Sequence, residues 1–319
     1  MNEKLSRSGF KELPIQAKSV LMRSIAEQYD LEFKTLWAFN RWGQSCTTGV
    51  FDKDDSEFVF VPGDKVTIGT ELSEFTPDKS DSDELLSLLD ETKYHGDTVS
   101  FIKSNLVRPR TVQIAPMLVE RRVSEIGWQP TDFSDERLRQ GKPSPLESFW
   151  QYENSDINRF VISKRAKFLK RGIDWQPYIY NDITYTGLLR GLAQSGFALP
   201  NPDEWAYLCG GGCGSLFAWG DGCSNLTLRH FDEPDSSGLY ELDKPNFFGT
   251  IIGNDPYKRE LVEADKLTTC GGDGGVNICG GVGRLLGYIS CSPHYAPRTS
   301  DNDDIDNEFD FFRRIIRIS

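Results

Sequence analysis

Two features that are common in proteins that bind membranes or nucleic acids are missing from this sequence: long apolar runs and clustered basic residues. No stretch approaches the roughly 20 apolar residues that a membrane-spanning helix needs, and residues 1–6 contain no apolar core of a secretory signal. Acidic residues outnumber basic ones by 48 to 36, and only residues 164–171 gather several cations. Because contact with phosphate backbones needs clustered Lys and Arg, we expect no nucleic-acid partner, no membrane contact, and a cytoplasmic protein or one delivered elsewhere as part of an assembly.

Several catalytic signatures are also absent. The three histidines, His95, His230 and His294, lie far apart, so the sequence has no H-x-x-x-H pair of the kind that holds iron. It has no G-x-S-x-G motif, and the glycine cluster at residues 270–275 is not followed by the G-K-[ST] of a phosphate-binding loop. The sequence therefore indicates neither non-haem iron chemistry nor a P-loop, although it leaves a Ser-His-Asp or Cys-His site open.

The cysteines are seven in number, and all but Cys46 lie from position 209 onward. An odd number without a secretory signal disfavours a disulfide framework. We therefore expect most of them to be buried free thiols that pack as small apolar side chains. Cys209 and Cys213 have a spacing that could form half of a zinc site, but the second pair is incomplete, which favours packed thiols in a glycine-rich turn.

The N-terminal region is expected to be helical. Residues 10–42 carry apolar side chains at helical spacing, which suggests a helical extension over residues 1–50. This extension would pack against the main domain, residues 51–319, or against a partner in an assembly. At the start of the main domain, residues 57–61 and 65–69 predict two short strands around a Pro-Gly turn.

The remainder of the chain is expected to have few regular elements. Asn201 can cap a helix that begins at Pro202 and ends at the glycines from Gly210. Beyond Gly210 the recurring glycines favour irregular loops. The other expected elements are a short helix over 83–89 inside an acidic surface loop over 70–97, a strand over 112–123, a helix over 183–195 and a terminal strand over 309–318.

The order of several short motifs resembles the formylglycine-generating enzyme or sulfatase-modifying-factor family. Each motif alone is weak, but together they occur in the family's order from about residue 57 to residue 315. The motifs are FVFVPGDKVTIG (58–69), PMLVERRVS (116–124), LPNPDEWAY (199–207), FAWGD (217–221), FGTIIGN (248–254), the doublet Gly274-Gly275, and NDDIDNEFDFFR (302–313). The resemblance implies an α+β, C-type-lectin-like fold with a small twisted sheet, few helices and long irregular loops.

The same resemblance implies that the family's oxidase chemistry is missing. Catalytic members bind copper with two cysteines five residues apart. Aligning the glycine doublet puts Cys279 on the first of them and Arg284 on the second, while Val276 replaces a serine beside the oxygen pocket. A guanidinium is always protonated and cannot ligate copper. Cys291 could replace the second thiolate only if the loop were rearranged, so we expect no copper.

Calcium is a further cofactor that the resemblance raises. The family's Gly-Asn motif matches Gly253 and Asn254, but Tyr257 stands where a glutamate is expected. An oxygen-rich run near the C-terminus could supply further ligands, and a solvated acidic loop is the alternative. The candidate cation site comprises Asn254, Asp301, Asp303 and Asp304.

Three functions remain in view. The first is a non-oxidase member of the family that binds a protein or small-molecule ligand through its C-terminal loop face. There the ligand-binding residues would be Tyr288, Cys291, His294 and Tyr295. The second is an enzyme with altered chemistry, in which Cys279 is a lone nucleophile or redox thiol and Arg284 lowers its pKa. The third is a structural subunit of a larger assembly.

Overall fold

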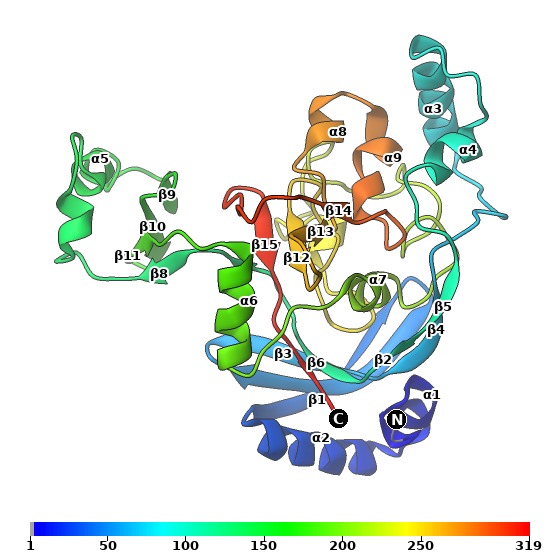
Figure 1. Cartoon of the computed structure of the whole chain (residues 1–319), viewed down its shortest axis with the longest axis horizontal. Coiled ribbons are helices and arrows are strands. Elements are labelled where there is room, and N and C mark those ends of the chain that lie inside the picture. Colours follow the sequence, from blue (N-terminus) through cyan, green and yellow to red (C-terminus); the bar gives the residue numbers. More distant parts are fainter. Residues whose placement is uncertain (1–2) are drawn as a thin grey trace.

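The computed structural model describes residues 3–319 and has a mixed α+β architecture with several small sheets (Figure 1). The largest part of the core rests on a five-stranded sheet in which every neighbouring pair is antiparallel. In sheet order its strands are β1 (Glu32–Arg41), β2 (Gln44–Lys53), β3 (Ser56–Val61), β6 (Met117–Glu120) and β16 (Ile315–Arg317). The predicted α+β class, with small sheets and few helices, is confirmed.

A second five-stranded sheet stands beside the first and is made of shorter strands. Its one parallel pair joins β12 to β15, which brings the C-terminal segment next to a strand about 50 residues earlier. In sheet order its strands are β14 (Arg298–Thr299), β13 (Thr268–Cys270), β12 (Arg259–Val262), β15 (Asp310–Phe312) and β7 (Ser124–Glu125). A separate two-stranded sheet pairs β4 (Asp64–Ile68) with β5 (Arg110–Ile114).

Nine α-helices lie among residues 3–319, and most are short. Two of them match the sequence prediction closely. Helix α6 (Tyr185–Gln194) is capped by Thr184, and helix α7 (Pro202–Gly210) begins with a capping box between Asn201 and Glu204. The others are α1 (Arg7–Glu12), α2 (Ile15–Tyr29), α3 (Lys79–Glu91), α4 (Thr98–Lys103), α5 (Pro145–Trp150), α8 (Val276–Cys279) and α9 (Gly283–Gly287). None of the helices in this part of the chain is long and apolar enough to cross a membrane.

The predicted N-terminal helix over 10–42 is wrong from Leu31 onward. Helix α2 ends at Asp30, whose φ of 56° is left-handed, and strand β1 follows. β1 joins β2 through a two-residue turn in which Trp42 and Gly43 both have positive φ, as a tight hairpin requires. Aromatic and β-branched residues at period two in β1 outweigh the helical spacing. The predicted boundary after residue 50 falls inside β2.

Other predicted strands exist but are divided differently. Residues 57–61 and 65–69 do form strands, β3 and β4, yet these belong to different sheets. The strand expected over 112–123 is two strands, β5 and β6, interrupted at Pro116, which has no backbone N–H to give to a ladder. The terminal strand over 309–318 is likewise divided, into β15 and β16. The short helix over 83–89 is confirmed within the longer α3.

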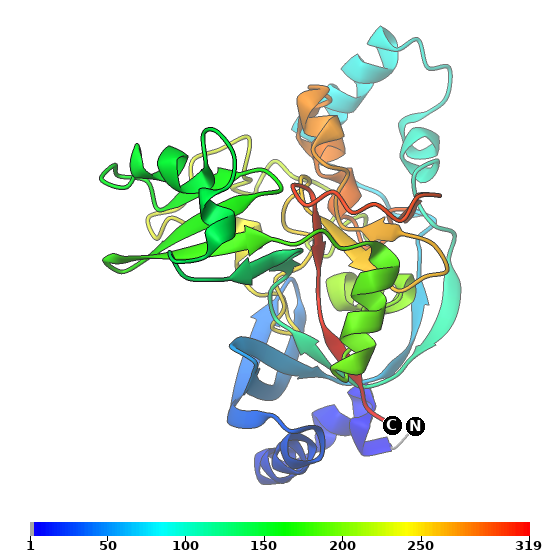
Figure 2. The same ribbon diagram turned by 60° about the vertical axis from the view of Figure 1, so that its left-hand side comes forward.

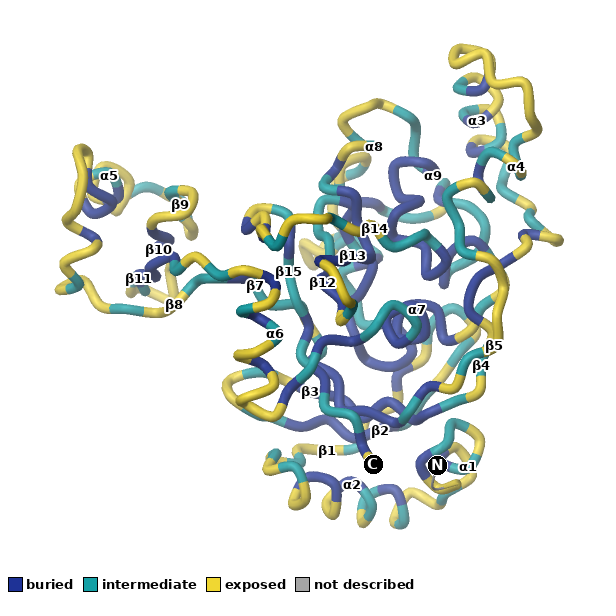
Figure 3. The backbone as a smooth tube through the Cα atoms, in the orientation of Figure 1, coloured by how far each residue is buried: buried dark blue, intermediate teal, exposed yellow. Residues whose placement is uncertain are grey.

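Residues 128–180 form a separate lobe that we did not predict from the sequence. Its four strands, in the order β8, β11, β10, β9, carry a core of their own, and Figures 1 and 2 show the lobe projecting from the body beside α6. Figure 3 shows a small buried patch inside it, apart from the buried centre of the body. Besides α5, the lobe contains β8 (Trp128–Pro130), β9 (Arg159–Ile162), β10 (Ala166–Arg171), β11 (Asp174–Tyr180) and the 3-10 turn η2 (Glu136–Arg139).

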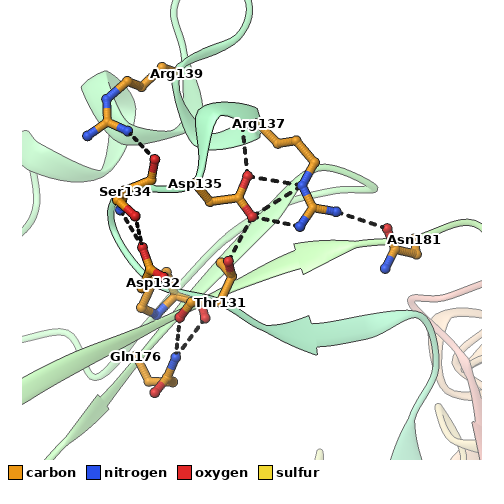
Figure 4. A network of polar contacts seen from close by, with 9 residues as sticks. Thr131, Asp132, Ser134, Asp135, Arg137, Arg139, Gln176 and Asn181 are labelled. Carbon is orange, nitrogen blue, oxygen red and sulfur yellow. Dashed lines mark hydrogen bonds and ion pairs between the residues drawn. The ribbon is translucent and has the colours of Figure 1, made fainter.

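A polar network fixes the loop that follows β8 (Figure 4). The Asp135 carboxylate accepts hydrogen bonds from the Thr131 hydroxyl at 2.7 Å and from the Arg137 guanidinium at 2.6 Å. The Gln176 side-chain amide, on β11, donates to the Thr131 carbonyl at 2.6 Å. The Arg137 hydrogen bond is the main reason that the pKa of Asp135 lies well below its ordinary value. These contacts explain why a polar segment with little regular structure keeps a defined path.

A buried ion pair joins the C-terminal segment to the second sheet. Arg313 is fully buried, and its guanidinium binds both carboxylate oxygens of Glu260 at 3.1 Å. Its remaining donors reach the carbonyls of Glu120 and Ile251, each at 2.6 Å. One side chain thus connects β12, β6 and the loop at Ile251 to the turn between β15 and β16.

Replacing Arg313 with methionine tests this connection. We expect Arg313→Met to lower the free energy of unfolding by about 3–5 kcal/mol, because Glu260 would be left buried without its partner. Arg313→Met/Glu260→Met should recover part of that loss, since no unpaired charge remains. Urea denaturation measures both, and Arg137→Met, at an exposed ion pair, is the matched control with an expected cost of at most about 1 kcal/mol. A loss for Arg313→Met as small as that of the control would contradict this role.

Candidate functional site

The thiol of Cys279 lies on the surface at the end of the short helix α8. It is exposed, and its Sγ is 3.1 Å from the hydroxyl oxygen of Tyr257. The glycine doublet before α8 makes this approach feasible. Gly274 and Gly275 have φ of +74° and +77°, and a Cβ on Gly275 would collide with the Tyr257 ring. Both positions therefore favour glycine because their φ is positive, and position 275 also needs glycine because the Tyr257 ring leaves no room for a Cβ.

A histidine, His230, and a buried carboxylate, Asp255, contact Tyr257. The His230 ring lies 4.7 Å from the Tyr257 ring, centroid to centroid, and its Nε2–H donates to Asp255 at 3.0 Å. Asp255 also accepts the backbone N–H of Tyr257 at 3.1 Å, so it holds both neighbours in place. The hydrogen bond to Cys279 is the main reason that the pKa of the Tyr257 phenol is raised above its ordinary value.

Exposed or half-buried apolar side chains lie on α8 and next to the residues that contact it. Val276 is 61% exposed and Phe231, next to His230 in the chain, is 38% exposed. The Phe309 ring lies 6.3 Å from the Tyr257 ring. We call Phe231, Tyr257, Val276, Cys279 and Phe309 the α8 face.

Arg284 does not join Cys279 in this site. Its guanidinium donates to both carboxylate oxygens of Asp232, at 3.0 and 2.6 Å, and to the carbonyl of Leu226 at 2.8 Å. It also lies over the Phe231 ring, 5.3 Å from the centroid. This bidentate pair raises the pKa of Arg284. The contacts of Arg284 are therefore those of a structural ion-pair partner, and none of them is with Cys279.

The residues here do not fit the copper site of the resembling family. Cys279 has a phenol as its hydrogen-bond partner, and the aligned second position is the cation Arg284. Cys291, the substitute that we considered, is fully buried, and its Sγ donates to the Gly271 carbonyl at 3.5 Å. Its thiol thus points into the core, and burial raises its pKa.

Three of the four predicted ligand-binding residues are buried in the core. Tyr288 is fully buried, and its hydroxyl donates to the Arg229 carbonyl at 2.7 Å. Cys291 packs in the same apolar cluster, and His294 is 2% exposed. Tyr295 alone is half-buried, and its hydroxyl accepts from Arg298 at 2.9 Å. The spacing of these residues did not reveal that the chain turns inward after α9.

Three of the four predicted cation-site residues have separate partners. The four are Asn254, Asp301, Asp303 and Asp304. Asn254 donates to Asp243 at 3.2 Å, Asp301 binds Lys266 at 2.6 Å, and Asp303 accepts from the N–H and hydroxyl of Thr186, each at 3.0 Å. Within residues 3–319 no group of three or more His, Cys, Asp or Glu is arranged to hold a metal ion.

The expectation that most thiols are buried and free is confirmed. All seven cysteines are free and four are buried: Cys209, Cys223, Cys270 and Cys291.

Sequence reasoning missed the contact between Tyr257 and His230. It also missed the hydrogen bond from His230 to Asp255, which lies 25 residues further along the chain. No local pattern connects these positions, because the long loops that carry them have no periodicity.

No family model matches the sequence, and no curated protein matches it significantly.

His294 predicts a measurable pH dependence of stability. Burial is the main reason that its pKa is lowered to about 4, against an ordinary value of 6.5. At pH values between about 4 and 6.5, the unfolded chain binds more protons than the folded chain. The stability that the neutral His294 contributes is therefore complete above pH 6.5 and is lost as the pH falls toward 4. We expect the wild-type protein to lose about 3 kcal/mol more than His294→Gln between pH 7 and pH 4.

Urea denaturation of both proteins at several pH values checks this. Glutamine can still donate to the Ser215 carbonyl, which His294 Nε2 approaches at 3.0 Å, so the variant should fold. Parallel stability curves for the two proteins across this pH range would show that His294 is not buried as described.

Proposed function

We propose that this chain is a non-oxidase member of the formylglycine-generating enzyme or sulfatase-modifying-factor family, with the family's C-type-lectin-like fold. In this proposal it binds a protein or peptide through the α8 face. The segments that carry the resemblance support it, because they form well-packed parts of the body. Residues 58–61 lie in β3, residues 117–120 in β6, and residues 202–207 in α7.

The observation that carries the binding function is the exposed apolar surface around Cys279. Large side chains that stay exposed around a fixed frame are typical of interaction sites, and aromatic anchors dominate such interfaces. The frame is rigid here because Asp255 holds His230 and Tyr257 in place and Arg284 holds the loop that carries Phe231. Loops held by a rigid scaffold are where binding residues concentrate.

A second candidate is thiol chemistry at Cys279. The phenol contact of Cys279 and the His230–Asp255 pair favour it, since a base held by a carboxylate near a nucleophile is the usual catalytic arrangement. The imidazole, however, donates its Nε2–H to Asp255, and its ring contacts Tyr257. This geometry gives the imidazole a positioning role, and we therefore rank thiol chemistry second.

A peptide-selection experiment tests binding at the α8 face. The full-length protein would be used to select from a random peptide library, and the selected peptides would be tested against Val276→Asp. We expect this charge to weaken binding about tenfold or more, because it lies among the apolar anchors. The matched control is Ile173→Asp, at a lobe residue that is 90% exposed, and it should bind as the wild type does. Peptides that bind Val276→Asp and the wild type equally would contradict the proposal.

Alkylation kinetics separate the two candidates. Under the binding proposal, His230→Ala leaves the iodoacetamide modification rate of Cys279 within about threefold of the wild type, because the imidazole does not activate the thiol. Site-resolved mass spectrometry measures that rate at pH 7. A fall of about a hundredfold, within the usual range for loss of a general base, would favour thiol chemistry instead.

A further inference from the structure

A cavity of about 390 Å³ lies between the N-terminal helices and the β1–β2 turn. In Figure 1 this region, at α1 and α2, is at the opposite end of the body from α8. Its charged lining residues are Arg7, Lys11 and Lys18, and no Asp or Glu lines it. Three cations around one cavity stand out in a chain whose net charge is −12.

Lys18 is the central observation. It is only 8% exposed, and lysine is almost never buried without a partner. Its ammonium group donates to the Lys11 carbonyl at 3.1 Å and lies 5.2 Å from the centre of the Phe10 ring. No carboxylate among residues 3–319 comes within ion-pair distance of it. Because an ammonium has three N–H donors, Lys18 keeps donors free toward the cavity that it lines.

The other two cations leave positive charge at the same place. Arg7 donates to the Gln44 side-chain oxygen at 2.6 Å and to the Gly211 carbonyl at 2.7 Å, while the Asp64 carboxylate is 3.7 Å away and offsets part of its charge. Lys11 is exposed at the rim. Cys46, which also lines the cavity, has a pKa raised to about 11 by burial, and the charges of Arg7 and Lys18 oppose that rise. Both cations are therefore close enough to act on a group bound there.

We propose that this cavity binds a small organic phosphate. A phosphate monoester carries close to two negative charges at neutral pH. Its charge therefore matches three cations better than the single charge of a carboxylate. Lys18 would bind the phosphate as a point charge and Arg7 through its planar group. Phe10 and Pro62, both buried, form part of the cavity wall against which the rest of the molecule would pack. The site is independent of the α8 face and of the function proposed for it.

Calorimetric titration with three probes tests this: inorganic phosphate, phenyl phosphate and benzoate. We expect phenyl phosphate to bind with a stoichiometry of one, and more tightly than either of the others. Lys18→Met should weaken it about tenfold or more, as the loss of a charge-assisted hydrogen bond predicts. Lys79→Met, at a side chain that is 91% exposed, is the matched control and should bind as the wild type does.

The folding of the variant can be checked independently. Methionine keeps the length of the lysine stem and removes an uncompensated buried charge, so Lys18→Met should melt no lower than the wild type in the absence of phosphate. Phenyl phosphate should also slow the alkylation of Cys46 but not that of Cys279, which lies on the α8 face. Absence of binding at millimolar phenyl phosphate would overturn the proposal, as would equal binding of benzoate or equal binding by a folded Lys18→Met protein.

Discussion

The Arg313–Glu260 ion pair is the interaction on which the rest of the structure depends. Two similar pairs accompany it: Arg314 binds Glu120 and Arg317 binds Glu204, each with two hydrogen bonds. Of the three pairs, Arg313–Glu260 is the most deeply buried. The three glutamates are 2–4% exposed. A buried carboxylate without a cation is strongly unfavourable, so the last segment can occupy only the register that satisfies all three. This constraint joins the two sheets and α7 into one body.

The same constraint holds the α8 face in position. The segment from residue 271 to residue 309 leaves β13 and returns at β15, and both strands belong to the sheet that Arg313 secures. Between them the backbone turns tightly at glycines with positive φ. Arg284 and Asp232 then connect α9 to the loop that carries Phe231. A long segment whose only regular elements are short, such as α8, α9 and β14, thus becomes a fixed surface.

Local signals in the sequence were reliable where one interaction decides the outcome. The capping box at Asn201 and the glycines after Gly210 placed α7 within one residue. The helical prediction failed at β1, because spacing alone does not separate a half-buried strand from a helix, and the tight turn at Trp42-Gly43 was the signal that could have corrected it. The lobe at residues 128–180 was missed since its strands are short and its core residues are spread along the chain from Leu138 to Ile179.

Pairings between distant residues could not be predicted at all. His230 and Asp255, Arg284 and Asp232, and the burial of Lys18 depend on how loops and helices pack, and sequence spacing carries no information about that packing. The glycine doublet was more informative. It set the alignment that put Cys279 on the family's first catalytic cysteine and Arg284 on the second, and the structure gives a steric reason for the glycine at 275.

The central claim is that Cys279 belongs to a binding surface and has no second thiolate with which to hold copper. Titration of the reduced protein with Cu(I), in competition with a chelator, tests this most directly when wild type and Cys279→Ser are compared. The account predicts the same weak uptake of copper by both proteins. A tight complex with one copper per chain that disappears in Cys279→Ser would contradict it.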